Sequence, residues 1–160
     1  MRLDEAHVRH EHHHQSPELL PTGPFGYIWD AIEAGAASRE YCICESVHQE
    51  LNRSGDPLFT WAKNLPGLIC QTTSHEMQLA GKISQEHPGW VSNQTNAADP
   101  FLVAHAIHEG SVIVTNERRA GPGVTDAKQK IPNVAGENGV ATISFLDFLR
   151  SAPWSHPSRR

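Results

Sequence analysis

The chain has 160 residues, 38% of them hydrophobic and 19% charged, with a formal net charge of −5 when the histidines are neutral. This composition is typical of one soluble domain with a sizeable core, which we expect over residues 1–150, before a loose tail over residues 151–160. No apolar stretch approaches the ~20 residues of a membrane span, and the N-terminus lacks the apolar core of a signal peptide. These two features favour a cytoplasmic location without membrane contact. Three cysteines cannot all pair within one chain, which fits a reducing compartment.

The acidic balance argues against a large non-specific nucleic-acid surface. It is compatible with a nuclease, because an acidic metal site contributes negative charge that the bound ion offsets. The basic residues gather late in the sequence, so we expect a phosphate backbone to meet that end of the molecule. They are Arg118, Arg119, Lys128, Lys130, Arg150, Arg159 and Arg160.

The first half of the chain predicts helices separated by short apolar runs. Apolar residues recur at helical spacing from Phe25 and predict a helix that ends near Gly35. A short apolar run follows at residues 41–44, and Val47 and Leu51 then share one helical face.

Two Asp-Pro pairs have the signature of a helix N-cap followed by a proline in the first turn. The pair at residues 56–57 opens one predicted helix, and another helix is predicted over residues 74–86. The pair at residues 99–100 opens a helix that Gly110 ends.

Beyond Gly110 the pattern predicts two short buried strands, over residues 111–115 and 139–143, separated by a long polar connection. That connection covers residues 116–138, and Ser144 with Asp147 forms a capping box for a last helix. Helices between short strands favour an α/β sandwich, in which the two strands are parallel and helices cover both faces of the sheet. Ligands of such sheets bind beyond the carboxyl ends of the strands, which is where Glu117 stands in the sequence.

Four acidic residues are candidates for a metal site: Asp4, Glu50, Asp99 and Glu117. Clustered carboxylates repel one another unless a cation lies among them. Mg²⁺ and Mn²⁺ prefer such oxygen ligands, and either ion activates water and stabilises the charge that develops when a phosphodiester is hydrolysed. The pattern therefore raises the hypothesis of a metal-dependent hydrolase.

Each candidate also has a structural interpretation. Asp99 stands where a helix N-cap is expected, and spacing alone favours that role over a ligand role. Glu50 suits an exposed helix position, and Asp4 suits a frayed chain end. Glu117 suits a loop residue that pairs with Arg118 or a nearby lysine. On the pattern alone, these interpretations outweigh the metal site.

Three segments resemble the successive acidic motifs of PIN-domain proteins: Val47 to Leu51, Ala98 to Ala106, and Val112 to Glu117. Three more segments, over residues 25–29, 56–63 and 130–134, resemble a toxin-like (VapC-like) subfamily. The similarity covers about residues 18–150, and its most specific part is the Ala-Asp-Pro-Phe-Leu-Val-Ala segment with the strand that follows.

The resemblance implies a three-layer α/β/α sandwich with a mainly parallel sheet, a Mg²⁺ or Mn²⁺ ribonuclease site, and the role of toxin in a toxin–antitoxin pair. It implies RNA as substrate, and a small antitoxin protein or a second copy of the chain as partner. By motif match, Glu50, Asp99 and Glu117 are the second, third and fourth acidic ligands. Thr115 is the supporting hydroxyl at the strand end, and Asp4 takes the place of the first ligand.

The N-terminus departs from the family pattern. Family members begin with an apolar strand that runs into an aspartate, whereas only three residues precede Asp4 here. Ala6 stands where the family has a small hydroxyl or amide residue. This degenerate motif keeps a second hypothesis open, a catalytically inactive PIN-like module that binds protein or RNA.

A third hypothesis is a histidine-rich metal-binding protein. Residues 10–14 read His-Glu-His-His-His, which suits Zn²⁺ or Ni²⁺, although a solvated loop is favoured. Cys42, Cys44 and His48 lack a second ligand pair at a recognised spacing, so buried cysteines are expected instead. His105 and His108 share a predicted helix and are expected to be packing or surface residues rather than ligands.

Overall fold

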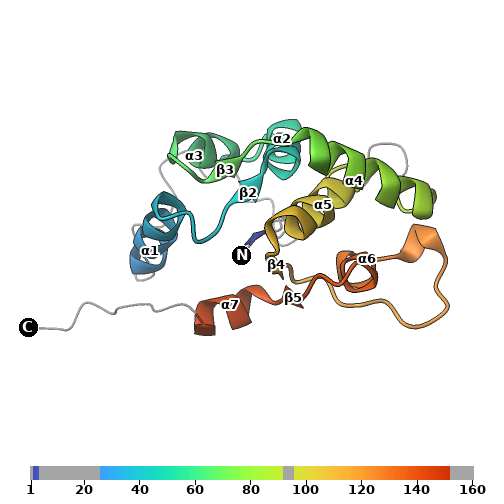
Figure 1. Ribbon diagram of the computed structural model, residues 1–160. Helices are drawn as coiled ribbons and strands as arrows, with labels where there is room; N and C mark the ends of the chain where they lie inside the picture. The colour runs from blue at the N-terminus through green and yellow to red at the C-terminus, as the bar shows by residue number, and fades with distance from the viewer. Residues whose placement is uncertain (1, 4–25, 92–95, 152–160) are drawn as a thin grey trace, which may run out of the picture.

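The computed structural model describes residues 2–3, 26–91 and 96–151, in which helices alternate with strands of two residues each (Figure 1). Asp4, the histidines of residues 10–14 and the predicted tail beyond Ser151 lie outside the described residues. In chain order the elements are β1 (Arg2–Leu3), α1 (Gly26–Ala37), β2 (Ile43–Cys44), α2 (Glu45–Ser54), α3 (Leu58–Asn64), β3 (Ile69–Cys70), α4 (Ser74–Glu86), α5 (Asp99–Glu109), β4 (Ile113–Val114), the 3-10 turn η1 (Asp126–Lys128), α6 (Ile131–Glu137), β5 (Thr142–Ile143) and α7 (Phe145–Ser151).

All the strand pairs of the described residues are parallel. β4 pairs with β1 and with β5, while β2 pairs with β3. β1 also lies beside β2, so the two groups of strands meet at β1. The parallel pair expected from residues 111–115 and 139–143 is confirmed by β4 and β5, although each strand is shorter than expected. The fold is therefore mixed α/β with small parallel sheets.

α5 is the central helix of the molecule. It contacts α2, α4, α6, β2 and β4, and its longest contact is with α4, which runs beside it in Figure 1. The run from Leu102 to Ala106 is buried on every side, as expected for a helix that is apolar around most of its circumference. α5 is thus held against several elements at once.

Most of the predicted helix boundaries are confirmed. α4 covers residues 74–86 as predicted, and a capping box between Thr73 and Glu76 explains where it begins. α5 ends at Gly110, which adopts the left-handed conformation with φ of 60°. The expectation that Asp99 is the N-cap is wrong by one residue, because Ala98 occupies the N-cap position and makes no side-chain capping bond.

The connection over residues 116–138, expected to be a long polar link, contains two elements that were not predicted. They are η1 and the short helix α6. Pro132 lies in the first turn of α6, where its missing N–H costs nothing, and Ile131, Val134 and Ala135 are buried at helical spacing. Seven residues show too few turns for periodicity to reveal such a helix.

The three cysteines do not all remain reduced. Cys42 and Cys70 form a disulfide across a sequence separation of 28 residues, and Cys44 is buried outside it. Disulfides are typical of oxidising compartments, so this bond differs from the expectation of reduced cysteines. Among the described helices, none combines the length and the apolar character that crossing a bilayer requires.

Tyr41 packs directly against α1 at Gly35. Its ring is buried, and its hydroxyl donates to the carbonyl groups of Ala31 and Ile32, each at 2.8 Å. Burial, together with the charge of Glu40, raises the pKa of Tyr41 to about 12. A Cβ atom at position 35 would overlap the Tyr41 ring, which explains why glycine is favoured at this point of α1.

We expect Gly35→Ala to lower the free energy of unfolding by about 1–3 kcal/mol, because overpacking against Tyr41 outweighs the helix propensity of alanine. The matched control is Gly81→Ala in α4, where an added Cβ meets nothing within 4 Å. This control is expected to raise the free energy of unfolding by roughly 0.5–1 kcal/mol. Urea denaturation measures both changes, and a shift of the same sign in both variants would contradict close packing at Gly35.

Candidate metal centre at the start of α5

Glu50 and the start of α5 lie together in the structure. The Glu50 side chain extends from α2, and its Oε1 accepts a hydrogen bond of 3.1 Å from the backbone N–H of Ala98. Ala98 directly precedes Asp99, and both acidic side chains are half-buried. A carboxylate at a helix N-terminus is favoured by the helix dipole, which helps to hold Glu50 in this place. Two of the four predicted ligands therefore come from distant segments to one helix end.

The segment after β4 forms a tight turn that positions Glu117. Thr115 is buried at the end of β4, and its Oγ1 accepts a hydrogen bond of 3.1 Å from the Glu117 backbone N–H. The neighbouring Asn116 accepts from the Phe145 N–H at 2.9 Å, which ties the turn to the start of α7. The supporting hydroxyl predicted at residue 115 thus shapes the backbone that carries Glu117.

The carboxylate of Glu117 is engaged by α6. Its Oε2 accepts from the Ile131 N–H at 2.9 Å, and its Oε1 lies 3.3 Å from the Lys130 Nζ. This is the lysine pairing that the sequence offered as a structural interpretation of Glu117. The contact also supplies a hydrogen-bond acceptor at the start of α6, where the N-cap residue Lys130 supplies none.

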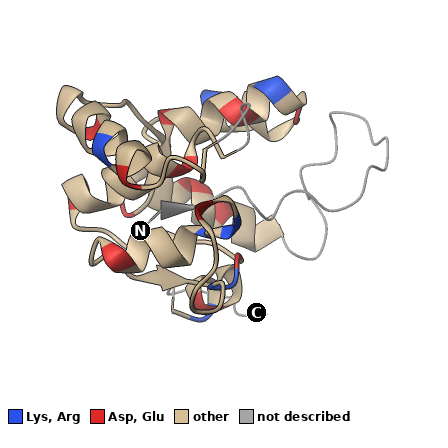
Figure 2. Cartoon of the chain, turned by 90° about the vertical axis from the view of Figure 1, so that its right-hand side faces the viewer, with Lys and Arg blue, Asp and Glu red and all other residues tan. Residues whose placement is uncertain are grey.

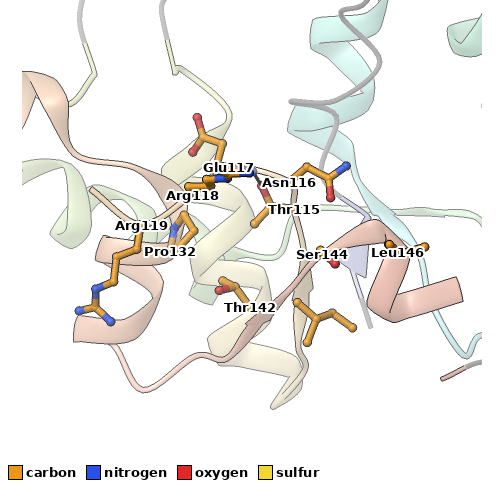
Figure 3. A pocket seen from close by; sticks show the side chains of 10 residues that line it. Thr115, Asn116, Glu117, Arg118, Arg119, Pro132, Thr142, Ser144 and Leu146 are labelled. Carbon is orange, nitrogen blue, oxygen red and sulfur yellow. Dashed lines mark hydrogen bonds between the residues drawn. The ribbon is translucent and has the colours of Figure 1, made fainter. Parts of the chain in front are cut away.

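A shallow cleft of about 610 Å³ lies at the carboxyl ends of β4 and β5 (Figure 3). Arg118 and Arg119 are exposed at its rim, and the guanidinium of Arg119 lies against α6 beside Gly136. Its lining residues are Thr115, Asn116, Glu117, Arg118, Arg119, Pro132, Thr142, Ile143, Ser144 and Leu146.

Figure 2 shows no continuous run of basic residues along the described chain in the view that it presents. In the view of Figure 2 acidic and basic residues are interspersed along the helices, and neither sign covers a whole side. The two arginines at the cleft are therefore a local feature. Such a pair suits contact with one or two phosphates rather than with a long stretch of backbone.

Two groups of three metal-ligating side chains converge within the described part of the chain, with all donor atoms within 4.8 Å of one another. Neither group includes Glu50, Asp99 or Glu117. They are Cys42, Cys70 and His105, and Glu76, His105 and Glu109. The structure thus brings Glu50 to Asp99 but does not close a three-carboxylate site around them.

A family model described as a domain of unknown function (DUF4411) matches residues 19–156. The chain belongs to the DUF4411 family. No curated protein matches it, and no solved structure does. The DUF4411 region contains Glu50, Asp99 and Glu117 but begins after β1 and Asp4.

The converging residues of this DUF4411 domain were largely missed by the sequence patterns. His105 was expected to be a packing or surface residue; it is buried, and its Nδ1 bonds to Oε1 of the buried Glu76, a partner that the sequence did not indicate. Burial opposes the charge on Glu76, but hydrogen bonds from Thr73 and His105 outweigh burial and lower the pKa of this carboxyl group. The Thr73–Glu76 capping box was the one sequence signal that could have marked Glu76 as a constrained residue.

The cysteine and histidine trio considered from the sequence does not assemble. His48 lies with Phe59, whose carbonyl oxygen is 2.9 Å from its Nε2 and whose ring stacks on the imidazole at 4.3 Å. Cys42 is bonded instead to Cys70, which the local spacing gave no reason to choose.

Proposed function

We propose that this DUF4411 domain is a PIN-like, Mg²⁺- or Mn²⁺-dependent endoribonuclease that acts as the toxin of a toxin–antitoxin pair. The observation that carries the proposal is the position of the Glu50 carboxylate at the start of α5, beside Asp99. Mixed α/β structure with parallel strands also supports it, and we propose that the complete arrangement is the three-layer α/β/α sandwich of that family.

The strand topology supports the same location. β1 ends at Leu3, whose partner is Val114, so the carboxyl ends of β1 and β4 lie side by side. The chain leaves β1 for β2 and β3 before it returns to β4, and ligands of parallel sheets bind at such a change of direction. Asp4 follows Leu3 in the sequence, and it joins Glu50 and Asp99 in the proposed ligand set as an inference from the sequence.

Carboxylate oxygens fit a hard divalent cation, and when bound there the cation would supply an activated water and stabilise developing negative charge. Glu50 and Asp99 would hold it from two elements. The exposed guanidinium groups of Arg118 and Arg119 would neutralise phosphates of the bound RNA. Thr115 keeps the turn in place through its bond to the Glu117 N–H.

Two observations favour a second candidate function, an inactive PIN-like module that binds RNA or protein. Both carboxylate oxygens of Glu117 already have partners, Lys130 before α6 and Ile131 at its start, and Glu50, Asp99 and Glu117 do not converge into a group of three within the described residues. A domain of this kind would keep the cleft with Arg118 and Arg119 while lacking the chemistry.

The two functions are separated by incubating the full-length protein with single-stranded RNA and Mn²⁺, with EDTA as the metal-free control. The nuclease predicts cleavage that EDTA abolishes and that added Mn²⁺ restores. Gel-shift binding without cleavage would support the inactive module. The absence of both binding and cleavage would contradict both proposals.

Glu117→Gln tests whether Glu117 is a helix cap or a metal ligand. We expect a loss of stability of about 0.5–1 kcal/mol, because the variant gives up the partly exposed ion pair with Lys130. We expect the Mn²⁺ affinity measured by calorimetry to change roughly threefold or less, well below the change in Asp99→Asn. Lys130→Gln is the matched control for the ion pair. A loss of Mn²⁺ affinity equal to that of Asp99→Asn would identify Glu117 as a ligand.

A further inference from the structure

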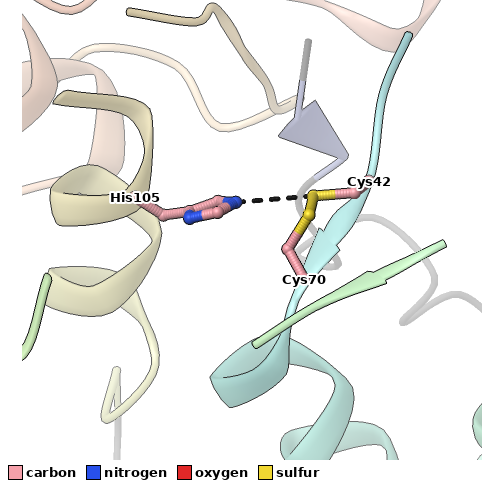
Figure 4. A group of neighbouring side chains, drawn as sticks. All are labelled: Cys42, Cys70 and His105. Carbon is pink, nitrogen blue, oxygen red and sulfur yellow. Dashed lines mark hydrogen bonds between the residues drawn. A yellow bond between two sulfur atoms is a disulfide. The ribbon is translucent and has the colours of Figure 1, made fainter. Parts of the chain in front are cut away.

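We propose that the reduced chain binds one Zn²⁺ through Cys42, Cys70 and His105, and that the disulfide is the oxidised, metal-free form of this site. Cys42 directly precedes β2, Cys70 lies in β3 and His105 lies on α5. The three side chains face one another in Figure 4. The site is independent of the proposed ribonuclease centre and does not rest on it.

One sulfur–nitrogen pair is already spaced as in a tetrahedral zinc site. The Cys42 Sγ lies 3.4 Å from the His105 Nε2, and the Sγ of Cys70 lies within the same 4.8 Å cluster. With the usual Zn–S and Zn–N bond lengths, sulfur and nitrogen ligands of one zinc ion lie ~3.5 Å apart. The Cα atoms of the two cysteines are 6.1 Å apart, which suits thiolates that share an ion as well as a disulfide. Reduction therefore requires only side-chain movement to complete the site.

Glu76 orients the histidine as carboxylates do in zinc proteins. Its Oε1 bonds to Nδ1 of His105, while its Oε2 accepts from the Thr73 N–H at 2.6 Å. A proton on Nδ1 leaves the lone pair of Nε2 directed toward Cys42. Histidine ligands of metals generally donate the other ring N–H to such an acceptor. If the Glu76–His105 hydrogen bond served only to join α4 to α5, the His105 Nε2 would not need to face the sulfur atoms of Cys42 and Cys70.

The surroundings allow an ion to enter. Cys42, Cys70 and His105 line a cavity of about 340 Å³, although Cys42 and His105 are almost fully buried. The cavity leaves room for water at a fourth coordination position. Thiolate and imidazole ligands prefer Zn²⁺, whereas carboxylates such as Glu50 and Asp99 suit Mg²⁺ or Mn²⁺. The two centres are therefore expected to take different ions.

The two forms are connected by a balanced exchange with a dithiol. The dithiol supplies two electrons and two protons, the bond between Cys42 and Cys70 breaks to give two thiols, and the dithiol becomes a disulfide. Binding of Zn²⁺ then forms two Zn–S bonds and one bond to the His105 nitrogen, and the two thiol protons pass to solvent.

Cobalt provides the test, because a thiolate bound to Co²⁺ gives an intense near-ultraviolet charge-transfer band. We expect the reduced full-length protein to develop this band with one equivalent of Co²⁺, and Zn²⁺ to abolish it. The oxidised protein and Cys70→Ser are expected to lack the band, whereas the control Cys44→Ser retains it. Histidine-only sites, such as residues 10–14 or the exposed pair His75 and His108, give no thiolate band.

Absence of the band in the reduced, folded protein would overturn the proposal, and so would a band that survives Cys70→Ser. Circular dichroism establishes that each variant is folded. If Cys70→Ser does not fold, the rate of cysteine alkylation in the reduced wild-type protein tests whether the site binds Zn²⁺. Zn²⁺ is then expected to slow alkylation of Cys42 and Cys70 roughly tenfold or more, and equal rates with and without Zn²⁺ would overturn the site.

Discussion

Asp99→Asn is expected to reduce Mn²⁺-dependent RNA cleavage roughly 100-fold or more. A catalytic metal contributes several kcal/mol of charge stabilisation, and each ~1.4 kcal/mol corresponds to a factor of ten in rate. Asparagine keeps the size of the side chain and suits the first turn of α5, so the change removes the charge without removing the helix. Initial cleavage rates measured over a range of Mn²⁺ concentrations test this expectation.

The matched control is Asp30→Asn, which makes the same chemical change at an exposed position on α1. This variant is expected to cleave RNA at the wild-type rate. Thermal unfolding of both variants reports whether the fold is retained. A folded Asp99→Asn protein with unchanged cleavage would show that Asp99 is not part of the catalytic centre.

Phe148→Ala is expected to lower the free energy of unfolding by about 3–5 kcal/mol, as for other buried aromatic residues replaced by alanine. Phe148 is fully buried on α7, and its ring meets that of Tyr41 edge-on, with centroids 5.4 Å apart. Removing the ring leaves a cavity beneath α7 and exposes one face of Tyr41. A loss of this size is a large part of the total stability of a small domain.

Leu146→Ala provides the control on the same helix, since this side chain is 54% exposed. Its effect is expected to stay within about 0.5 kcal/mol. Urea denaturation of the two variants measures the difference. Equal losses would show that α7 is not anchored through Phe148.

The helices could be predicted where local chemistry marks both of their ends. α5 is the clearest case, since Asp99 and Pro100 mark its start and Gly110 its end. The strands were harder, because two residues are too short to show an alternating pattern, and β3 was not predicted at all. α6 was missed for a similar reason, and its absence from the prediction hid the backbone N–H of Ile131, which donates to Glu117.

The candidate sites also differ in how much of them the local sequence reveals. Glu50 and Asp99 were predicted through motifs that follow one another along the chain, and the structure places the Glu50 carboxylate against the N–H of Ala98, the residue before Asp99. The cluster of Cys42, Cys70 and His105 depends on how α5 packs against β2 and β3, which no spacing rule encodes. Contacts between residues far apart in sequence become visible only after the elements have packed.

The covalent link from Cys42 to Cys70 encloses the chain segment that forms α2 and α3. Such a closed loop limits the number of conformations open to the unfolded polypeptide, which favours the native state. A Zn²⁺ ion held by the same two sulfur atoms would close the same loop without a covalent bond. The entropic restraint on this part of the chain would then persist under both conditions. The Zn²⁺ ion would maintain it in reducing surroundings, and the disulfide would maintain it in oxidising surroundings.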